Sequence, residues 1–139
     1  IMYREFVAPY EKRIAAVVHR LGLPVYVHTC GAIGDRLDLM AETDVDGIDT
    51  LDPPPLGTVD LARAKAEFGK RFFFKGNLDA VNEMLRADDA VFERAVRRRL
   101  EIGKVGSGYI LSSACSVAPH VEPERLRRMV ELADRYGRP

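Results

Sequence analysis

The sequence of 139 residues has no tryptophan, only two cysteines and no excess of either charge, because 21 lysines and arginines balance 21 aspartates and glutamates. Two cysteines are too few for a disulfide scaffold. The balanced charge offers no basic surface to a nucleic acid. No apolar run approaches the roughly 20 residues of a membrane span, and no signal peptide pattern precedes the first helix. We therefore expect a cytoplasmic protein that binds neither nucleic acid nor membrane.

What the sequence does contain is a regular alternation of strand and helix patterns. Short β-rich apolar runs predict strands, and apolar residues at helical spacing predict helices. The predicted strands are Pro24–His28, Val45–Leu51, Arg71–Lys75 and Gly108–Ser112. The predicted helices are Tyr3–Leu21, Asp35–Glu42, one that starts at Thr58 or Asp60 and runs to Phe68, Asp79–Leu85, Asp89–Ile102 and one that opens at Glu122 and runs to Tyr136. The aromatic run Phe72–Phe74 predicts a strand buried on both faces.

About four strands, each followed by a helix, indicate an α/β protein with a parallel sheet. Two architectures fit this pattern: a doubly wound open sheet, or half of a (β/α)₈ TIM barrel, whose full length is typically about 250 residues. The first residues already have a helical pattern, so we expect a partial chain of a longer protein. Both architectures bring the loops after the strands to one rim of the sheet.

Metal-binding side chains follow the predicted strands at that rim. His28 and Cys30 follow the first strand, and Cys115 follows the fourth. Imidazole nitrogen and thiolate sulfur suit zinc, and three protein ligands leave a fourth position open for substrate. Residues two apart in an extended segment point the same way, so His28 and Cys30 can bind one ion. Asp52 is the preferred source of a fourth, oxygen ligand, with Asp49 the second choice.

Other interpretations of these residues stay open. Both cysteines could be small buried residues, they could form a disulfide, which the cytoplasm disfavours, or a cysteine could act as a nucleophile with His28. Asn77 and Asp79 follow the third strand and could bind substrate, or Asp79 could cap the next helix. His19 and His120 are expected at the surface.

Three segments carry a resemblance to a known family. They are Phe6–Gly34 (FVAPYEKRIAAVVHRLGLPVYVHTCGAIG), Gly76–Asp79 (GNLD) and Gly108–Gly137 (GYILSSACSVAPHVEPERLRRMVELADRYG). They resemble the C-terminal half of uroporphyrinogen decarboxylase-like proteins, and the resemblance covers nearly the whole chain. It implies that residues 1–139 are a single, partial domain with the last four or so units of a (β/α)₈ barrel.

The resemblance implies two kinds of activity. Uroporphyrinogen decarboxylases remove acetate carboxyls from a tetrapyrrole of porphyrin biosynthesis without metal or cofactor. Corrinoid-dependent methyltransferases of the same superfamily use zinc bound through H-x-C and a distant cysteine, which match His28, Cys30 and Cys115 here. That match favours methyl transfer between a corrinoid, delivered by a separate carrier protein, and a thiol-type small-molecule acceptor. The GNLD segment resembles both branches.

A third reading is a non-catalytic half-barrel. Four βα units cannot close a standard barrel and leave sheet edges open. A natural protein of this length would be expected to dimerise into a pseudo-barrel, and size-exclusion chromatography showing a stable monomer would count against that expectation.

Overall fold

The computed structural model describes residues 2–106 and 108–138. The strands of these residues are β1 Tyr26–Thr29, β2 Gly47–Thr50, β3 Phe73–Leu78 and β4 Tyr109–Ser113. The helices are α1 Met2–Phe6, α2 Ala8–Arg20, α3 Leu37–Ala41, α4 Leu61–Phe68, α5 Asp89–Gly103 and α6 Pro123–Tyr136. Within the described ranges, no helix is both long enough and apolar enough to cross a membrane.

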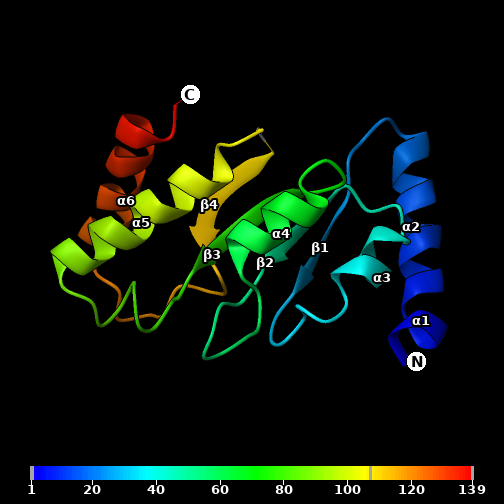
Figure 1. The fold of residues 1–139 in the computed structure, drawn as a ribbon, viewed down its shortest axis with the longest axis horizontal. Helices are drawn as coiled ribbons and strands as arrows, with labels where there is room; N and C mark the ends of the chain where they lie inside the picture. The colour runs from blue at the N-terminus through cyan, green and yellow to red at the C-terminus, as the bar shows by residue number, and fades with distance from the viewer. Residues whose placement is uncertain (1, 107, 139) are drawn as a thin grey trace.

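The strands form one parallel sheet in the order β1-β2-β3-β4, which is also their order in the chain. Right-handed crossovers between consecutive neighbours place all the connecting helices on one face of the sheet. Figure 1 shows α4 and α5 lying against that face. A doubly wound sheet reverses its strand order and carries helices on both faces. The consecutive order therefore decides between the two predicted architectures, and the fold is half of a (β/α)₈ barrel.

The sheet is curved, as a barrel wall must be. Neighbouring strands are about 4.8 Å apart, so a flat sheet would separate β1 from β4 by roughly 14 Å. Yet the Sγ atom of Cys30, just after β1, lies 3.7 Å from the Sγ atom of Cys115, just after β4. Curvature and the inward lean of the two loops together bring the first and last units into contact at the carboxyl ends of the strands.

The helix-covered face holds the core. Ile48 and Phe74 are register partners on β2 and β3, and neither has any exposed surface. Phe72 packs edge-on against Phe74, with ring centroids 6.0 Å apart. Buried residues of α3, α4 and α5 cover this layer: Leu37, Met40, Leu61, Ala64, Phe92, Val96 and Leu100.

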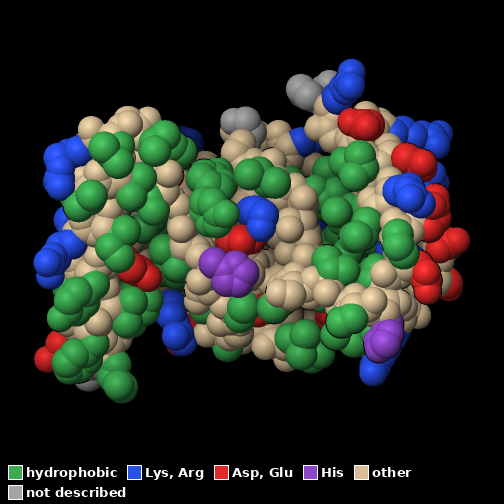
Figure 2. Space-filling model, turned by 180° about the vertical axis from the view of Figure 1, so that it is seen from behind, with side chains coloured by type: hydrophobic (Ala, Val, Ile, Leu, Met, Phe, Trp, Pro, Cys, Tyr) green, Lys and Arg blue, Asp and Glu red, His purple; other side chains and the backbone are tan. Residues whose placement is uncertain are grey.

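Figure 2 shows the molecule from the opposite side, where the other face of the sheet, here called the open face, lies. Here the prediction that Phe72–Phe74 are buried on both faces is wrong for Phe73, which is only half-buried. Its ring meets Tyr26 across β2, with centroids 5.8 Å apart. Gly47 lies between them, and a Cβ there would come within 2.6 Å of the Phe73 ring. The missing side chain of Gly47 therefore makes room for this aromatic pair on the open face.

Three predicted helices differ from the structure. The first is interrupted at Val7, because Pro9 belongs in the first turn of a helix rather than in its interior. The second is shortened to α3. The predicted helix Asp79–Leu85 is a series of turns instead, since the Asp79 carboxylate accepts the N–H groups of Val81 and Asn82 and holds a tight local turn.

Candidate functional site

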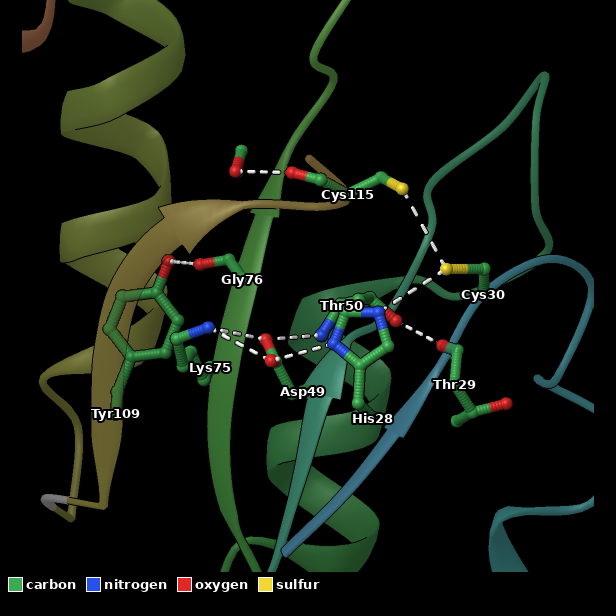
Figure 3. A network of polar contacts seen from close by, with 10 residues as sticks. His28, Thr29, Cys30, Asp49, Thr50, Lys75, Gly76, Tyr109 and Cys115 are labelled. Atoms are coloured by element: carbon green, nitrogen blue, oxygen red, sulfur yellow. Dashed lines mark hydrogen bonds and ion pairs between the residues drawn. The ribbon is translucent and has the colours of Figure 1, made fainter. Parts of the chain in front are cut away.

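The structure brings His28, Cys30 and Cys115 to one end of the sheet, as the sequence predicts (Figure 3). Cys30 is in the middle of the group. Its Sγ atom lies 3.5 Å from Nε2 of His28 and 3.7 Å from Sγ of Cys115. Both cysteines are free and exposed. Two thiols and an imidazole nitrogen therefore face one another from loops that are 85 positions apart in the chain.

These two distances match the edges of a zinc tetrahedron. With Zn–S distances of about 2.3 Å and a Zn–N distance of about 2.0 to 2.1 Å, two thiolates are about 3.8 Å apart, and a thiolate and an imidazole nitrogen about 3.5 Å. Two of the three distances between the ligand atoms of His28, Cys30 and Cys115 thus already fit a zinc site. The described residues hold no group of three such side chains that could bind a metal as they stand. Closing the triad requires His28 and Cys115 to approach each other.

A row of charged and polar side chains lies beside this group on the open face. His28, Asp49 and Lys75 are register partners on β1, β2 and β3, so their side chains share that face. Asp49 is only 4% exposed. Its Oδ2 atom is 3.0 Å from Nδ1 of His28, and both of its carboxylate oxygens accept from Nζ of Lys75 at 2.9 Å.

The row fixes the orientation of the imidazole. Burial works against ionisation of Asp49, but hydrogen bonds from Lys75 and His28 outweigh it and hold the pKa of the carboxyl below its ordinary value. An ionised carboxylate can only accept, so Nδ1 of His28 carries the proton. In the neutral imidazole Nε2 is then the nitrogen with the lone pair, and it is the one that faces the Cys30 sulfur. Metal-binding histidines are commonly oriented by a carboxylate in this way.

Electrostatics of the thiol pair disfavour a nucleophilic cysteine. A hydrogen bond with Cys115 is the largest cause that raises the pKa of Cys30, followed by desolvation and by the negative charges of Asp52 and Asp49. A catalytic cysteine needs the opposite, a lowered pKa in an electropositive setting. A cation placed between the sulfurs would reverse this effect. The arrangement suits metal binding better than a Cys–His nucleophile pair.

Asp52, the preferred oxygen ligand, is buried at the same rim. Its Oδ2 atom accepts the N–H of Gly31, the residue after Cys30. The left-handed φ of +86° at Gly31 is one that a glycine adopts without strain. Asp52 therefore holds the turn that carries Cys30, and its bond to Gly31 uses one of its two oxygens.

Asn77 lies apart from the thiols. Its side chain is buried, its Nδ2 donates to the Leu51 carbonyl at 2.9 Å and its Oδ1 accepts from Nε of Arg99 at 3.4 Å. It lines a cavity of about 270 Å³ between the loop after β2 and α5. The run Arg97–Arg99 lies in a helical pattern that predicts a solvated face, but the side chain of Arg99 is only 13% exposed and pairs with Glu83 at 2.8 Å, so that prediction is wrong for this arginine.

Asp79 forms the local turn that replaces the predicted helix. Its carboxylate accepts from the N–H groups of Val81 and Asn82 at 2.9 and 2.8 Å and from the Asn82 amide at 2.7 Å. A role in substrate binding for Asn77 and Asp79 stays a prediction, and it would require these internal hydrogen bonds to be exchanged.

We expect Asp79→Asn to destabilise the chain by about 1 kcal/mol at neutral pH, because the amide keeps one acceptor oxygen but loses the charge that strengthens the hydrogen bonds from Val81 and Asn82. Burial alone would raise the pKa of Asp79, but the hydrogen bonds from Asn82 and Val81 lower it by more, so the pKa of this carboxyl lies below its ordinary value. A lowered pKa stabilises the fold above the unfolded value of about 4, and that contribution is lost as the pH falls through the folded value. The deficit should therefore shrink in acid.

Denaturant unfolding followed by circular dichroism at neutral and acidic pH measures this effect. Asp38→Asn is the matched control, because Asp38 is exposed and should give a change within about 0.5 kcal/mol. A deficit for Asp79→Asn that stays constant with pH would contradict the prediction.

Two members of the polar row were missed or ranked low from the sequence. The sequence predicts Lys75 only as the end of a buried strand, although a lysine beside three aromatics is itself a signal of a buried ion pair. Asp49 is the second choice after Asp52 as an oxygen ligand of the metal, and that ranking stays a prediction. The register between β1 and β2 shows a different contact for Asp49, which lies opposite His28 and meets its Nδ1 atom.

The sequence is similar to known proteins of one family. The sequence model of the family "Uroporphyrinogen decarboxylase (URO-D)" matches residues 1–136. The chain belongs to this family. Uroporphyrinogen decarboxylase of Tolumonas auensis is 30% identical over 143 residues, and that of Pelobacter propionicus is 33% identical over 138. These matches take in 99% and 98% of the chain and 38% of each relative.

A solved structure shows the same fold. The structure of a methyltransferase from Methanosarcina mazei superposes with a TM-score of 0.80 at 20% identity, covering 96% of this chain and 36% of the other. The chain thus spans somewhat more than a third of the length of the proteins that it matches, in agreement with half a barrel of the URO-D family.

Proposed function

We propose that His28, Cys30 and Cys115 bind a catalytic zinc ion and that the complete enzyme transfers a methyl group between a corrinoid and a thiol-type acceptor. The observation that carries the proposal is the spacing of the three side chains together with the Asp49 carboxylate on Nδ1 of His28. Soft thiolates and an oriented imidazole are the donors that zinc prefers. The methyltransferase name of the Methanosarcina mazei structure agrees with this reading.

Bound zinc would supply an open position at which an acceptor thiol ionises at neutral pH. The chain's own residues prepare that position. Asp49 fixes the tautomer and the plane of His28, and Lys75 balances the carboxylate charge. Asp52 holds the turn that follows Cys30. Its second oxygen, Oδ1, would be a fourth ligand only until the acceptor thiol takes that position.

The proposed partners follow from the same chemistry. A corrinoid is bulky and would come to the rim of the sheet on a separate carrier protein, while the small acceptor would bind at the zinc. Asn77 and Asp79 are the proposed substrate contacts, and Asn77 lies apart from the thiols, in the cavity beside α5. A second copy of the chain is a further proposed partner. In the part of the chain described here, β1 and β4 each pair with one strand, and apolar side chains of the first two helices are exposed: Phe6, Tyr10, Ile14 and Val17.

The second candidate is decarboxylation of a porphyrinogen, which the names of the Tolumonas and Pelobacter relatives favour. It would need no metal, and the thiol pair would be incidental to it. The two candidates therefore differ in their metal requirement.

Zinc content separates them. Protein purified without added metal should contain about one zinc per chain, because a three-ligand site with an oriented histidine binds zinc firmly. Atomic emission spectroscopy measures it, with circular dichroism to confirm folding. Folded protein without zinc, both as purified and after incubation with zinc and gel filtration, would contradict methyl transfer and favour the decarboxylase.

A further inference from the structure

The two cysteines have a second chemical capacity, independent of metal. Their sulfur atoms lie 3.7 Å apart, close to contact, and both side chains are exposed. Figure 3 shows them pointing toward each other from the loops after β1 and β4. A small oxidant in solution can therefore reach either sulfur.

We propose that Cys30 and Cys115 form a reversible intramolecular disulfide, so that the rim of the sheet is a thiol modification site. Its reagent is a small-molecule disulfide. One cysteine thiolate attacks a sulfur of the reagent, which gives a mixed disulfide and releases one thiol. The other cysteine thiolate then attacks the protein sulfur of that mixed disulfide and releases the second thiol. The two cysteines lose two electrons and two protons, and the reagent gains them.

The geometry permits this bond. A disulfide needs its sulfurs at about 2.05 Å, so the two Sγ atoms must approach by roughly 1.7 Å. Both cysteines lie just beyond the ends of their strands, Thr29 and Ser113, where side-chain rotation does not disturb the ladder. A Cβ added at Gly31 would meet no atom within 4 Å, so there is open space beside the turn that follows Cys30.

The disulfide and the zinc ion would exclude each other, a point that rests on the proposed function. Zinc binds thiolates, and a disulfide has none. Oxidation would remove two of the three protein ligands at once, while bound zinc would shield both sulfurs from the reagent. The site would thus alternate between a reduced, metal-binding form and an oxidised form without metal.

Oxidised glutathione tests the disulfide on the 139-residue chain after treatment with a chelator. The expected product is a monomer about 2 Da lighter than the reduced chain, with one cross-linked peptide that contains Cys30 and Cys115. Because the fold holds the sulfurs together, the second step, from the mixed disulfide to the intramolecular disulfide, should run at least about tenfold faster in buffer than in denaturing guanidinium. Glutathionylation of both cysteines, covalent dimers or equal rates in the two conditions would overturn the proposal.

Two further arms separate this proposal from the metal site. Cys30→Ser and Cys115→Ser should each stop at a single glutathione adduct, which shows that the lighter product needs both thiols. Chain loaded with zinc should react at least about tenfold more slowly than chelated chain. A disulfide that forms equally fast with and without zinc would support the modification site and contradict the zinc site. Slow glutathionylation without a disulfide, in a chain that retains zinc, would support the zinc site and contradict the disulfide.

Discussion

Replacement of Cys115 by serine is expected to lower the zinc affinity of the chain at least about a hundredfold, or about 2.7 kcal/mol. Serine keeps the shape of the side chain, but its hydroxyl does not ionise near neutral pH and is a poor ligand for zinc. The Sγ atom of Cys115 also lies 3.7 Å from that of Cys30, a distance that fits two thiolates on one zinc ion. Competition with a coloured zinc chelator measures the affinity.

Two neighbouring variants control for indirect effects. Ser116→Ala changes the next residue of the same loop, and His120→Ala removes an exposed histidine a few positions further on. Both should retain the zinc affinity of the unchanged chain, whereas His28→Ala should lose it as Cys115→Ser does. Equal affinities for Cys115→Ser and Ser116→Ala would exclude Cys115 as a ligand.

Asp49→Asn is expected to lower zinc affinity by about 10- to 100-fold without changing any ligand. The substitution keeps the volume of a side chain that is 4% exposed, but it removes the charge that His28 and Lys75 share. The amide offers one acceptor oxygen, for which His28 and Lys75 compete, and an NH2 group that would favour the other tautomer of His28. Nε2 is then no longer held as the lone pair toward Cys30. The loss therefore acts on the orientation of the ligand.

A second carboxylate–histidine pair in the same sheet provides the control. Asp46, just before β2, lies 2.8 Å from Nε2 of His19 on α2 and also accepts the N–H of Val25. Asp46→Asn removes the same kind of ion pair on the opposite end of the strand. It should leave zinc affinity unchanged, and a fall as large as that of Asp49→Asn would show that both act through overall stability.

Much of the architecture and the position of the site follows from the sequence. Because polar residues come after each short apolar strand, the sequence places His28, Cys30, Asp52 and Cys115 at one rim, and the structure has them there. Strands joined by right-handed crossovers are parallel, so their carboxyl ends lie at the same edge of the sheet, and this position can be inferred from the sequence alone. The choice between a barrel half and a doubly wound sheet needed the strand order, which no local pattern encodes.

The finer contacts could not be read in this way. Asp49 and Asp52 are three positions apart, and only the register of β2 against β1 shows that Asp49 meets His28 whereas Asp52 meets Gly31. Asp79 illustrates the other limit. An aspartate before a helical pattern also fits a compact turn, and the hydrogen bonds that its carboxylate accepts from Val81 and Asn82 favour the turn.

The outermost strands of the sheet, β1 and β4, share no hydrogen-bonded neighbour, yet the loops that follow them touch through Cys30 and Cys115. Any bond at that contact, to metal or between the sulfurs, would link β1 to β4 across the two central strands. Local unfolding of β1 and of β4 would then become a single cooperative event. Amide hydrogen exchange in β1 and β4 would slow together, while β2 and β3, already flanked on both sides, would change little.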